Sequence, residues 1–227
     1  MGFDILSRFE GIRNFVFIGE AGSGKTEIAI NFARLLQEKG DRPVHFFDMD
    51  QTKPLFRARD AAKAVTDAGI QLRFQPQLLD TPLVPPGVIE GILDENCYTI
   101  LDVGGNEQGA RMMGQFSGAL NATASITFFV VNAYRPWSRD LDGIEATIEK
   151  ISRATRFSNI RIISNPNLGF DTRLEEVLAG HEKLLNLLQD QRPEFLCALE
   201  RLSEPVQAAL DIPVLPVRLH ILYPWQE

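Results

Sequence analysis

Short apolar runs recur along the chain and are separated by longer segments with a different spacing of apolar residues. The runs cover residues 14–18, 43–48, 98–102, 125–131, 159–164 and 212–219, and a weaker one covers 70–74. Runs of this length, bounded by turn-forming residues, are typical of strands that are buried on both faces of a sheet. The pattern therefore predicts about seven strands.

The segments between these runs favour helices. Apolar residues recur at helical spacing from Ile28 to Leu36, before Gly40, which is a C-terminal stop signal. Further helices are predicted over residues 55–68, 109–120, 140–153, 171–188 and 193–210. The segment 75–87 instead contains four prolines. Long proline-rich loops in compact domains often bind ligands or switch conformation.

Strands that alternate with helices in this way indicate an α/β fold. We expect a doubly wound, mostly parallel sheet with helices on both faces. A chain of 227 residues suits one domain, 1–227, which is long enough to bury roughly 70% of its unfolded surface. Sites in such sheets form at the carboxyl ends of the strands. The residues that directly follow the apolar runs are therefore the first candidates for chemistry.

The first apolar run leads into a P-loop. Gly19, Gly24, Lys25 and Thr26 satisfy the pattern G-x-x-x-x-G-K-[ST], between a predicted strand and a predicted helix. A chance match in a chain of this length has a probability on the order of one per cent. An ordinary glycine-rich turn with a solvated lysine is the alternative interpretation.

The residue types in this loop suit phosphate binding. Glycines let the backbone wrap around a phosphate, so that the N–H groups of Gly22, Ser23 and Gly24 and the following helix N-terminus point at its oxygens. Lys25 is predicted to reach the β- and γ-phosphates and to be catalytic. The Thr26 hydroxyl is predicted to ligate Mg²⁺.

Carboxylates follow two of the other apolar runs. Asp48 ends the run 43–48, and Asp50 follows it two residues later. Asp102 ends the run 98–102 and is followed by Gly104. An aspartate at the end of a buried strand in a P-loop protein typically helps to hold Mg²⁺, and a glycine amide beside it can sense the γ-phosphate. Without the P-loop, each motif could equally be a solvated strand end or a turn.

Composition excludes several classes of protein. Lys and Arg total 23 against 30 Asp and Glu, which gives a formal charge of −7. The sequence contains no long basic run, so nucleic-acid binding is disfavoured. Cys97 and Cys197 are far apart and form no C-x-x-C pair, so neither a disulfide framework nor a local metal site is predicted. The sequence lacks a signal peptide and an apolar run of membrane-spanning length. We expect a cytoplasmic protein that does not bind membranes.

The order of these motifs resembles the MinD/ParA/CobQ-type branch of P-loop ATPases, the SIMIBI class. The resemblance covers nearly the whole chain. It rests on the P-loop, Asp48-Met49-Asp50, Asp102-Val103-Gly104-Gly105, Ser164-Asn165 and Ile212-Pro213-Val214-Leu215-Pro216. The P-loop is the specific part of the match, and the later motifs are weak when taken alone.

The resemblance implies roles for the matching residues. Asp48 would belong to the Mg²⁺ shell, Asp50 would position or activate the attacking water, and Asp102 would be the Walker B carboxylate. The amide of Asn165 would read adenine, and the loop after Pro216 would flank the base. Many members of this branch form a homodimer with nucleotide at the interface, so a homodimer is expected here.

Glu20 departs from that family pattern. The family usually carries a lysine directly after the first glycine of the P-loop, and this lysine reaches the phosphates of the partner subunit. An acid near a triphosphate is repulsive. Three consequences are open: the contact is made by another residue such as Arg135 or Arg57, hydrolysis is slow, or the mechanism across the dimer is absent.

The leading hypothesis is an Mg²⁺-dependent ATPase that uses nucleotide state to switch conformation or dimerisation, and serves the maturation or regulation of a partner protein. ATP is preferred over GTP because Asn165-Pro166-Asn167-Leu168 lacks the Asn-Lys-x-Asp pattern that reads guanine in many GTPases.

Two alternatives belong to other classes. One is an ATP-dependent small-molecule ligase or kinase that resembles dethiobiotin synthetase, with Arg57 and Arg59 in the acceptor pocket. The other is a nucleotide-binding module without turnover, which Glu20 motivates.

Overall fold

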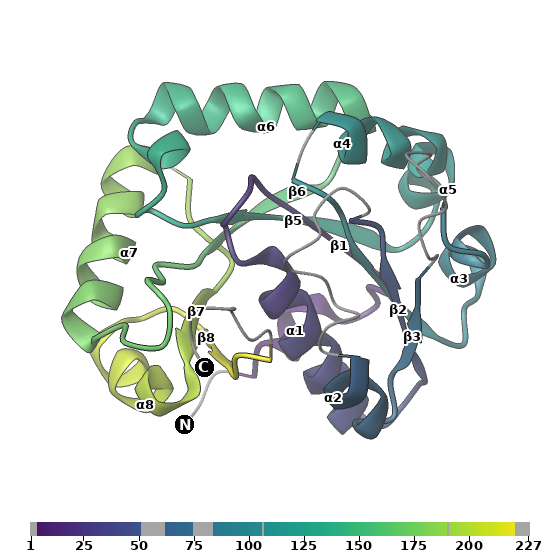
Figure 1. Ribbon diagram of the computed structural model, residues 1–227, viewed down its shortest axis with the longest axis horizontal. Helices are drawn as coiled ribbons and strands as arrows, with labels where there is room; N and C mark the ends of the chain where they lie inside the picture. Colours follow the sequence, from purple (N-terminus) through teal and green to yellow (C-terminus); the bar gives the residue numbers. More distant parts are fainter. Residues whose placement is uncertain (1–3, 51–61, 75–83, 106, 190, 221–227) are drawn as a thin grey trace.

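The computed structural model describes residues 4–50, 62–74, 84–105, 107–189 and 191–220. In these residues eight strands form one sheet, in the order β3-β2-β4-β1-β5-β6-β7-β8, and all neighbours are parallel. Helices cover both faces of this sheet (Figure 1). The predicted α/β fold with a doubly wound sheet is confirmed, with one strand more than expected.

The strands are β1 (Asn14–Ile18), β2 (Val44–Asp48), β3 (Gln71–Arg73), β4 (Tyr98–Asp102), β5 (Ser125–Val131), β6 (Ile160–Ser164), β7 (Leu196–Leu199) and β8 (Val214–Val217). The α-helices are α1 (Lys25–Lys39), α2 (Ala62–Asp67), α3 (Val88–Leu93), α4 (Glu107–Met113), α5 (Ser117–Ala122), α6 (Leu141–Thr155), α7 (Leu174–Leu188) and α8 (Glu200–Ala209). Short 3-10 helices are η1 (Leu6–Phe9), η2 (Gly114–Phe116) and η3 (Pro136–Ser138).

Alternation along the central strand divides the core between the two faces of the sheet. Phe15 and Phe17 of β1 pack in the cluster that includes α1 and α2. Val16 and Ile18 pack in the cluster that includes residues of α3 to α7. Because successive side chains of a strand point to opposite faces, one apolar run supplies both layers. This explains why β1 is continuously apolar from Phe15 to Ile18.

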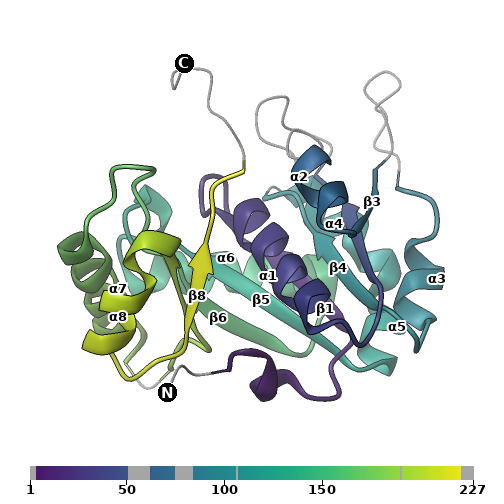
Figure 2. The same ribbon diagram turned by 90° about the horizontal axis from the view of Figure 1, so that it is seen from below.

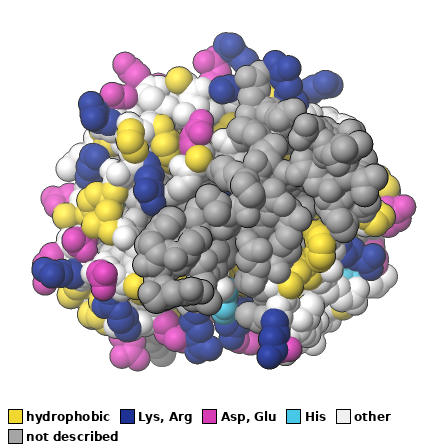
Figure 3. Space-filling view, viewed as in Figure 1, with side chains coloured by type: hydrophobic (Ala, Val, Ile, Leu, Met, Phe, Trp, Pro, Cys, Tyr) yellow, Lys and Arg dark blue, Asp and Glu magenta, His cyan; other side chains and the backbone are white. Residues whose placement is uncertain are grey.

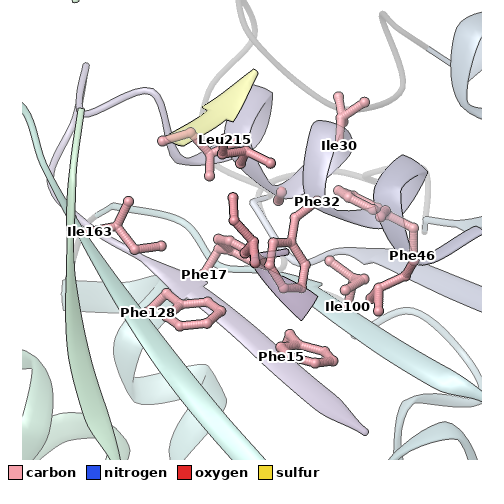
Figure 4. Close-up of a cluster of buried hydrophobic side chains, with 14 of the residues drawn as sticks. Phe15, Phe17, Ile30, Phe32, Phe46, Ile100, Phe128, Ile163 and Leu215 are labelled. Carbon is pink, nitrogen blue, oxygen red and sulfur yellow. The ribbon is translucent and has the colours of Figure 1, made fainter. Parts of the chain in front are cut away.

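The layer under α1 is dominated by phenylalanine rings. Phe128 of β5 is fully buried, and its ring centroid lies 5.2 Å from that of Phe9, 5.4 Å from that of Phe17 and 5.7 Å from that of Phe32. Figure 4 shows Phe128 beside Phe17, with Phe32 reaching down from α1. These contacts fix α1 over β1 and β5, and therefore fix the start of α1 at the ends of these strands.

Glycines set both ends of α1. Gly24 precedes the helix with φ of 90°, and Gly40 follows it with φ of 72°. Both angles lie in the left-handed region, which side chains other than glycine rarely adopt. The predicted stop at Gly40 is confirmed.

The prediction of a single helix over 193–210 is wrong. Residues 196–199 form β7, and α8 begins only at Glu200. Leu196, Cys197 and Ala198 are buried between β6 and β8 in the sheet. The helical spacing of Leu199, Leu202 and Val206, which pack in one cluster, obscured this short apolar run.

One further prediction is corrected, and one helix was not expected. The expected helix 109–120 is divided into α4, η2 and α5. At the division, a Cβ on Gly114 would lie 2.8 Å from the carbonyl oxygen of Ala154 in α6, so close packing on α6 requires glycine there. Helix α3 was not expected. Of the predicted helix 55–68, residues 62–67 form α2, and residues 55–61 lie outside the described part.

Charged side chains of both signs are interspersed around the described rim of the face in Figure 3. In the part of the chain that the structure describes, no helix is both long and apolar enough to cross a bilayer.

Replacing Phe128 with alanine tests the aromatic layer. We expect Phe128→Ala to lower the free energy of unfolding by about 3–5 kcal/mol, because it removes a fully buried ring and leaves a cavity. Urea denaturation measures the change. The control Phe170→Ala truncates a ring that is 43% exposed and is expected to change stability by less than about 0.5 kcal/mol. Equal effects of the two variants would contradict this account of the core.

Candidate nucleotide-binding site

Strand register brings the predicted acidic residues to the P-loop. β1 is flanked by β4 and β5, and β4 is flanked by β2. Asp102 of β4 lies opposite Phe17 of β1 and Asp48 of β2. Because all three strands run parallel, their carboxyl ends open at the same edge. Two carboxylates that are far apart in sequence therefore meet beside the loop that follows β1.

Lys25 lies among carboxylates at this edge. Its Nζ is 3.6 Å from Oδ2 of Asp50, and both side chains are almost completely buried. The backbone N–H of Asp50 donates to Oδ1 of Asp48 at 3.0 Å, and the N–H of Met49 donates to the carbonyl of Asp102 at 2.9 Å. The backbone after β2 is thereby held in place, with Asp50 against Lys25.

Burial raises the pKa of Asp102 to about 7. The negative charges of Asp48 and Asp50 act in the same direction, whereas the charge of Lys25 and a hydrogen bond with Thr26 lower this pKa. Desolvation is the largest cause, because the side chain is fully buried. An additional cation at this edge would favour the ionised form.

Two glycines after β4 allow the chain to touch the P-loop. A Cβ on Gly105 would lie 2.6 Å from the carbonyl oxygen of Gly19, and one on Gly104 would lie 3.0 Å from Oδ1 of Asp50. At Gly105 a side chain would displace the P-loop backbone, and at Gly104 it would displace the side chain of Asp50. The glycines following Asp102 thus place this segment directly against Gly19 and Asp50.

Asn165, which follows β6, holds the P-loop from the other side. Its Nδ2 donates to the carbonyl oxygen of Ser23 at 2.7 Å, and a Cβ on Gly24 would lie 2.3 Å from the same nitrogen. The amide nitrogen of Asn165 is therefore engaged with backbone in this conformation. The adenine-reading role stays a prediction. The Ser23 hydroxyl is buried beneath the loop, close to Gly19.

A pocket opens above the P-loop and is bordered by several of these residues. Its wall is made by Gly22, Gly24, Lys25, Thr26, Glu27, Ile28, Asp50, Asn132, Arg135, Asn165, Asn167, Val217 and Leu219. Of the predicted residues, Gly22, Gly24, Lys25, Thr26, Asp50 and Asn165 are thus brought together. Pro216 is exposed on β8 and is not in this wall, where Val217 and Leu219 lie instead.

Sequence reasoning missed the residues that attach the chain after β8 to α1. The carboxylate of Glu27 accepts the N–H of His220 at 2.9 and 3.0 Å. Asn31 accepts the N–H of Arg218 at 2.9 Å and donates to its carbonyl at 2.8 Å. Figure 2 shows β8 beside α1. The helical face of Glu27 and Asn31, four residues apart, was the available signal, but nothing in the sequence identified its partner.

Asn132 was also missed. It follows β5, its Nδ2 donates to the carbonyl of Asn167 at 2.7 Å, and its own carbonyl accepts the hydroxyl of Ser138 at 2.6 Å. Its position directly after a strongly apolar strand was the only signal. Of the arginines suggested for contact with an anion, Arg135 lies in the pocket wall, and Arg57 and Arg59 lie outside the described residues.

The oxygen donors at this edge suit a partial Mg²⁺ site. In the described segments, no three His, Cys, Asp or Glu side chains gather into a complete metal site. Mg²⁺ usually keeps several waters and takes one or two protein ligands beside substrate phosphates. The buried Thr26 and Asp102, with Asp48 in the neighbouring strand, suit such a partial site. The pKa of Asp102 is raised, so a bound cation would stabilise its ionised form.

A cavity of about 500 Å³ lies at the other ends of β7 and β8. His181, Arg192 and Glu194 are in its wall, and none of the predicted site residues is. Burial lowers the pKa of His181 to about 4, and its Nδ1 lies 3.0 Å from the hydroxyl of Ser164. His181 is therefore a neutral core residue with a hydrogen-bond partner.

A P-loop between the central strand and α1, faced by buried acidic strand ends, defines a P-loop nucleotide-binding protein. The family model for the CobQ/CobB/MinD/ParA nucleotide binding domain matches residues 15–184. The chain belongs to this family.

Solved structures of SIMIBI proteins share the fold. The FtsY signal recognition particle receptor of Elizabethkingia anophelis, in complex with GDP, is 13% identical with a TM-score of 0.54, over 85% of this chain and 62% of that one. FtsY of Thermotoga maritima is 13% identical with a TM-score of 0.56, over 82% and 62%. FlhF complexed with GTP and Mg²⁺ is 14% identical with a TM-score of 0.51, over 82% and 66%.

This chain therefore spans less than two thirds of the length of each of these proteins. No curated protein is significantly similar to it in sequence.

Replacing Asp102 with asparagine tests the buried charge. A raised pKa means that the folded protein holds this proton more tightly than the unfolded chain. The associated stability is complete below the ordinary value of 3.8 and is lost as pH rises through about 7. We expect Asp102→Asn to gain stability over the wild type between these limits, on the order of a few kcal/mol at alkaline pH.

Urea titrations with EDTA and without nucleotide, at a series of pH values, measure the difference. The control is Asp94→Asn. Asn96 lowers the pKa of the exposed Asp94 through a backbone hydrogen bond, so this variant should show no such trend above 3.8. A difference for Asp102→Asn that does not change with pH would contradict the assignment.

Proposed function

We propose that this chain is an Mg²⁺-dependent ATP-binding and ATP-hydrolysing switch protein of the MinD/ParA-like type, which regulates or matures a partner protein. Membership of the CobQ/CobB/MinD/ParA family supports nucleotide binding. The observation that carries the proposal is the buried cluster of Lys25, Asp50 and Asp102, of which Lys25 and Asp50 are in the wall of the P-loop pocket.

Each group in the cluster has a separate task in the proposal. The N–H groups of Gly22, Ser23 and Gly24 and the ammonium of Lys25 bind the phosphates. The carboxylate of Asp50, held against Lys25, orients the water that attacks the γ-phosphorus. As the new P–O bond forms, the bond to the β–γ bridging oxygen breaks, and ADP and inorganic phosphate result.

The metal site and the sensor complete the proposed centre. Thr26, Asp48 and Asp102 would hold Mg²⁺ directly or through water, and the ion neutralises charge on the β- and γ-phosphates when it is bound. Gly104 senses the γ-phosphate through its amide. Because Gly104 lies against Asp50, and Gly105 against the P-loop backbone, loss of this phosphate relaxes the segments after β2 and β4.

ATP is the proposed nucleotide rather than GTP. The guanine-binding pattern Asn-Lys-x-Asp ends in an aspartate, and Leu168 occupies that position here. Asn167, the residue before it, is in the pocket wall. Two structural neighbours are complexes with GDP and with GTP, so the preference has to be measured on this chain. A homodimer with nucleotide at its interface is part of the proposal.

Binding and hydrolysis of Mg·ATP and Mg·GTP by the purified protein test the function. We expect ATP to bind more tightly than GTP and to be hydrolysed. Lys25→Ala should abolish binding, because it removes the buried phosphate-binding cation. Asp50→Ala should retain binding and lower turnover about 100-fold or more, a typical loss for a group that acts on the reacting water. Sizing in parallel reports an ATP-dependent dimer.

Each outcome has a separate meaning. Tight binding without turnover would replace the ATPase by a sensor or by an enzyme that a partner activates. GTP preference would reverse the base assignment. If neither nucleotide binds to folded protein, the proposed function is wrong.

The hydrogen bonds between α1 and the chain after β8 predict how the protein holds the base of the nucleotide. Val217 and Leu219 are in the pocket wall, and Asn31 fixes the intervening Arg218 through two backbone hydrogen bonds. We expect Asn31→Leu to weaken ATP binding about 5- to 30-fold, since two hydrogen bonds contribute about 1–2 kcal/mol. Binding of inorganic tripolyphosphate should be unchanged, because that ligand has no base.

Calorimetric titration with both ligands makes the comparison. The control is Arg218→Ala, which removes an exposed ion pair with Glu200 but leaves the backbone bonds to Asn31. It should alter ATP affinity less than about twofold. Parallel weakening of ATP and tripolyphosphate by Asn31→Leu would contradict a role in holding the base.

A further inference from the structure

Most charged side chains in the pocket wall already contact another group of the protein. Its wall contains two cations, Lys25 and Arg135, and two acids, Glu27 and Asp50. Lys25 is close to Asp50, and Glu27 accepts the N–H of His220. Among the described residues of this wall, Arg135 is the cation without an acidic partner.

The P-loop itself needs a further positive charge. A nucleoside triphosphate carries several negative charges, and hydrolysis is accelerated by cations that lie where charge develops. Glu20, directly after the first glycine of the loop, adds a negative charge instead. A cation from elsewhere in the fold that reaches the loop would offset this negative charge.

The Arg135 side chain lies directly on the loop. Its Nε donates to the carbonyl oxygen of Gly22 at 2.8 Å. A Cβ on Gly22 would lie 3.2 Å from this Nε and 3.3 Å from Cζ, so the guanidinium covers the position where a side chain would be. A guanidinium has five N–H donors. In the described part of the protein, only the Nε–H of Arg135 has a hydrogen-bond acceptor.

The backbone that presents Arg135 is firmly held. Its N–H donates to the carbonyl of Asn132 at 3.0 Å, and its own carbonyl accepts the hydroxyl of Ser138 at 2.9 Å. On either side, the Tyr134 hydroxyl donates to the carbonyl of Glu176 at 2.5 Å, and the Trp137 ring packs edge-on against Phe129. These contacts fix the loop to β5, the neighbour of β1.

We propose that Arg135 binds the terminal phosphate of the nucleotide through its terminal guanidinium nitrogens, within the same chain that supplies the P-loop. The inference rests on the proposed function. Each chain supplies the positive charge of Arg135 to its own P-loop, so no second copy of the chain is needed for this contact. The bond from Nε to Gly22 orients the guanidinium, and the charge acts on the phosphate.

Two substitutions separate these two contributions. In Arg135→Gln, the amide nitrogen is the same number of bonds from the backbone as Nε of arginine. The bond to Gly22 can therefore form, but the charge is lost. Arg135→Lys keeps the charge without the planar group. The matched control is Arg139→Ala, an exposed arginine four residues further along that is not in the pocket wall.

The affinities for Mg·ADP and for a non-hydrolysable Mg·ATP analogue are measured by calorimetry for each protein. We expect Arg135→Gln to weaken binding of the ATP analogue about tenfold and to leave binding of ADP nearly unchanged. Arg135→Lys should retain part of the preference for the analogue over ADP. Where ATP is hydrolysed, Arg135→Gln should lower kcat by about 10- to 100-fold. Adding the Lys25→Ala protein, which keeps Arg135 but lacks the phosphate-binding lysine, to the Arg135→Gln protein should not restore turnover, because Arg135 acts on the P-loop of its own chain. Arg139→Ala should behave as the wild type.

If Arg135→Gln prefers the ATP analogue over ADP as strongly as the wild type does, the proposal is wrong. Arg135 would then only support the backbone of Gly22. Equal weakening of ADP and the analogue would also overturn it, as would turnover that is restored when Lys25→Ala is added to Arg135→Gln. These outcomes differ from failure of the proposed function, in which the folded wild type binds neither nucleotide. Urea midpoints equal to the wild type confirm that each variant is folded.

Discussion

The burial of several charges at one edge of the sheet is the constraint on which the site depends. Lys25, Asp50 and Asp102 are each at most 5% exposed, and charges are expensive to remove from water unless they are paired. The cost is offset partly by the pairing of Lys25 with Asp50, and partly by the upward shift in the pKa of Asp102. A polyanion with its cation is the natural complement of such an edge.

The shape of the P-loop depends on segments that are distant in sequence. Asn165 holds the carbonyl of Ser23, Arg135 holds that of Gly22, and Gly105 lies against Gly19. A glycine-rich loop has high conformational entropy when unfolded, so its ordered form requires these contacts. The segments that follow β4, β5 and β6 therefore all meet at the loop.

The sequence predicted the sheet and the central motifs because their signals are local. The apolar runs of β1, β4 and β5, the stop at Gly40 and the carboxylates at strand ends follow from the order of residues alone. It failed at β7, whose four residues continue into the helical spacing of α8. The chain after Pro216 was expected to flank the base, and Val217 and Leu219 of that chain are in the pocket wall.

The sequence by itself determined the fold class, the position of the P-loop and the acidic residues that accompany it, since each depends on spacing within a few residues. The tertiary structure alone decided which distant groups meet. It placed Asp48 opposite Asp102, Arg135 on Gly22, and the chain after β8 against Glu27. These pairings depend on strand order and on the packing of α1 on the sheet, and neither is encoded in the spacing of any single segment.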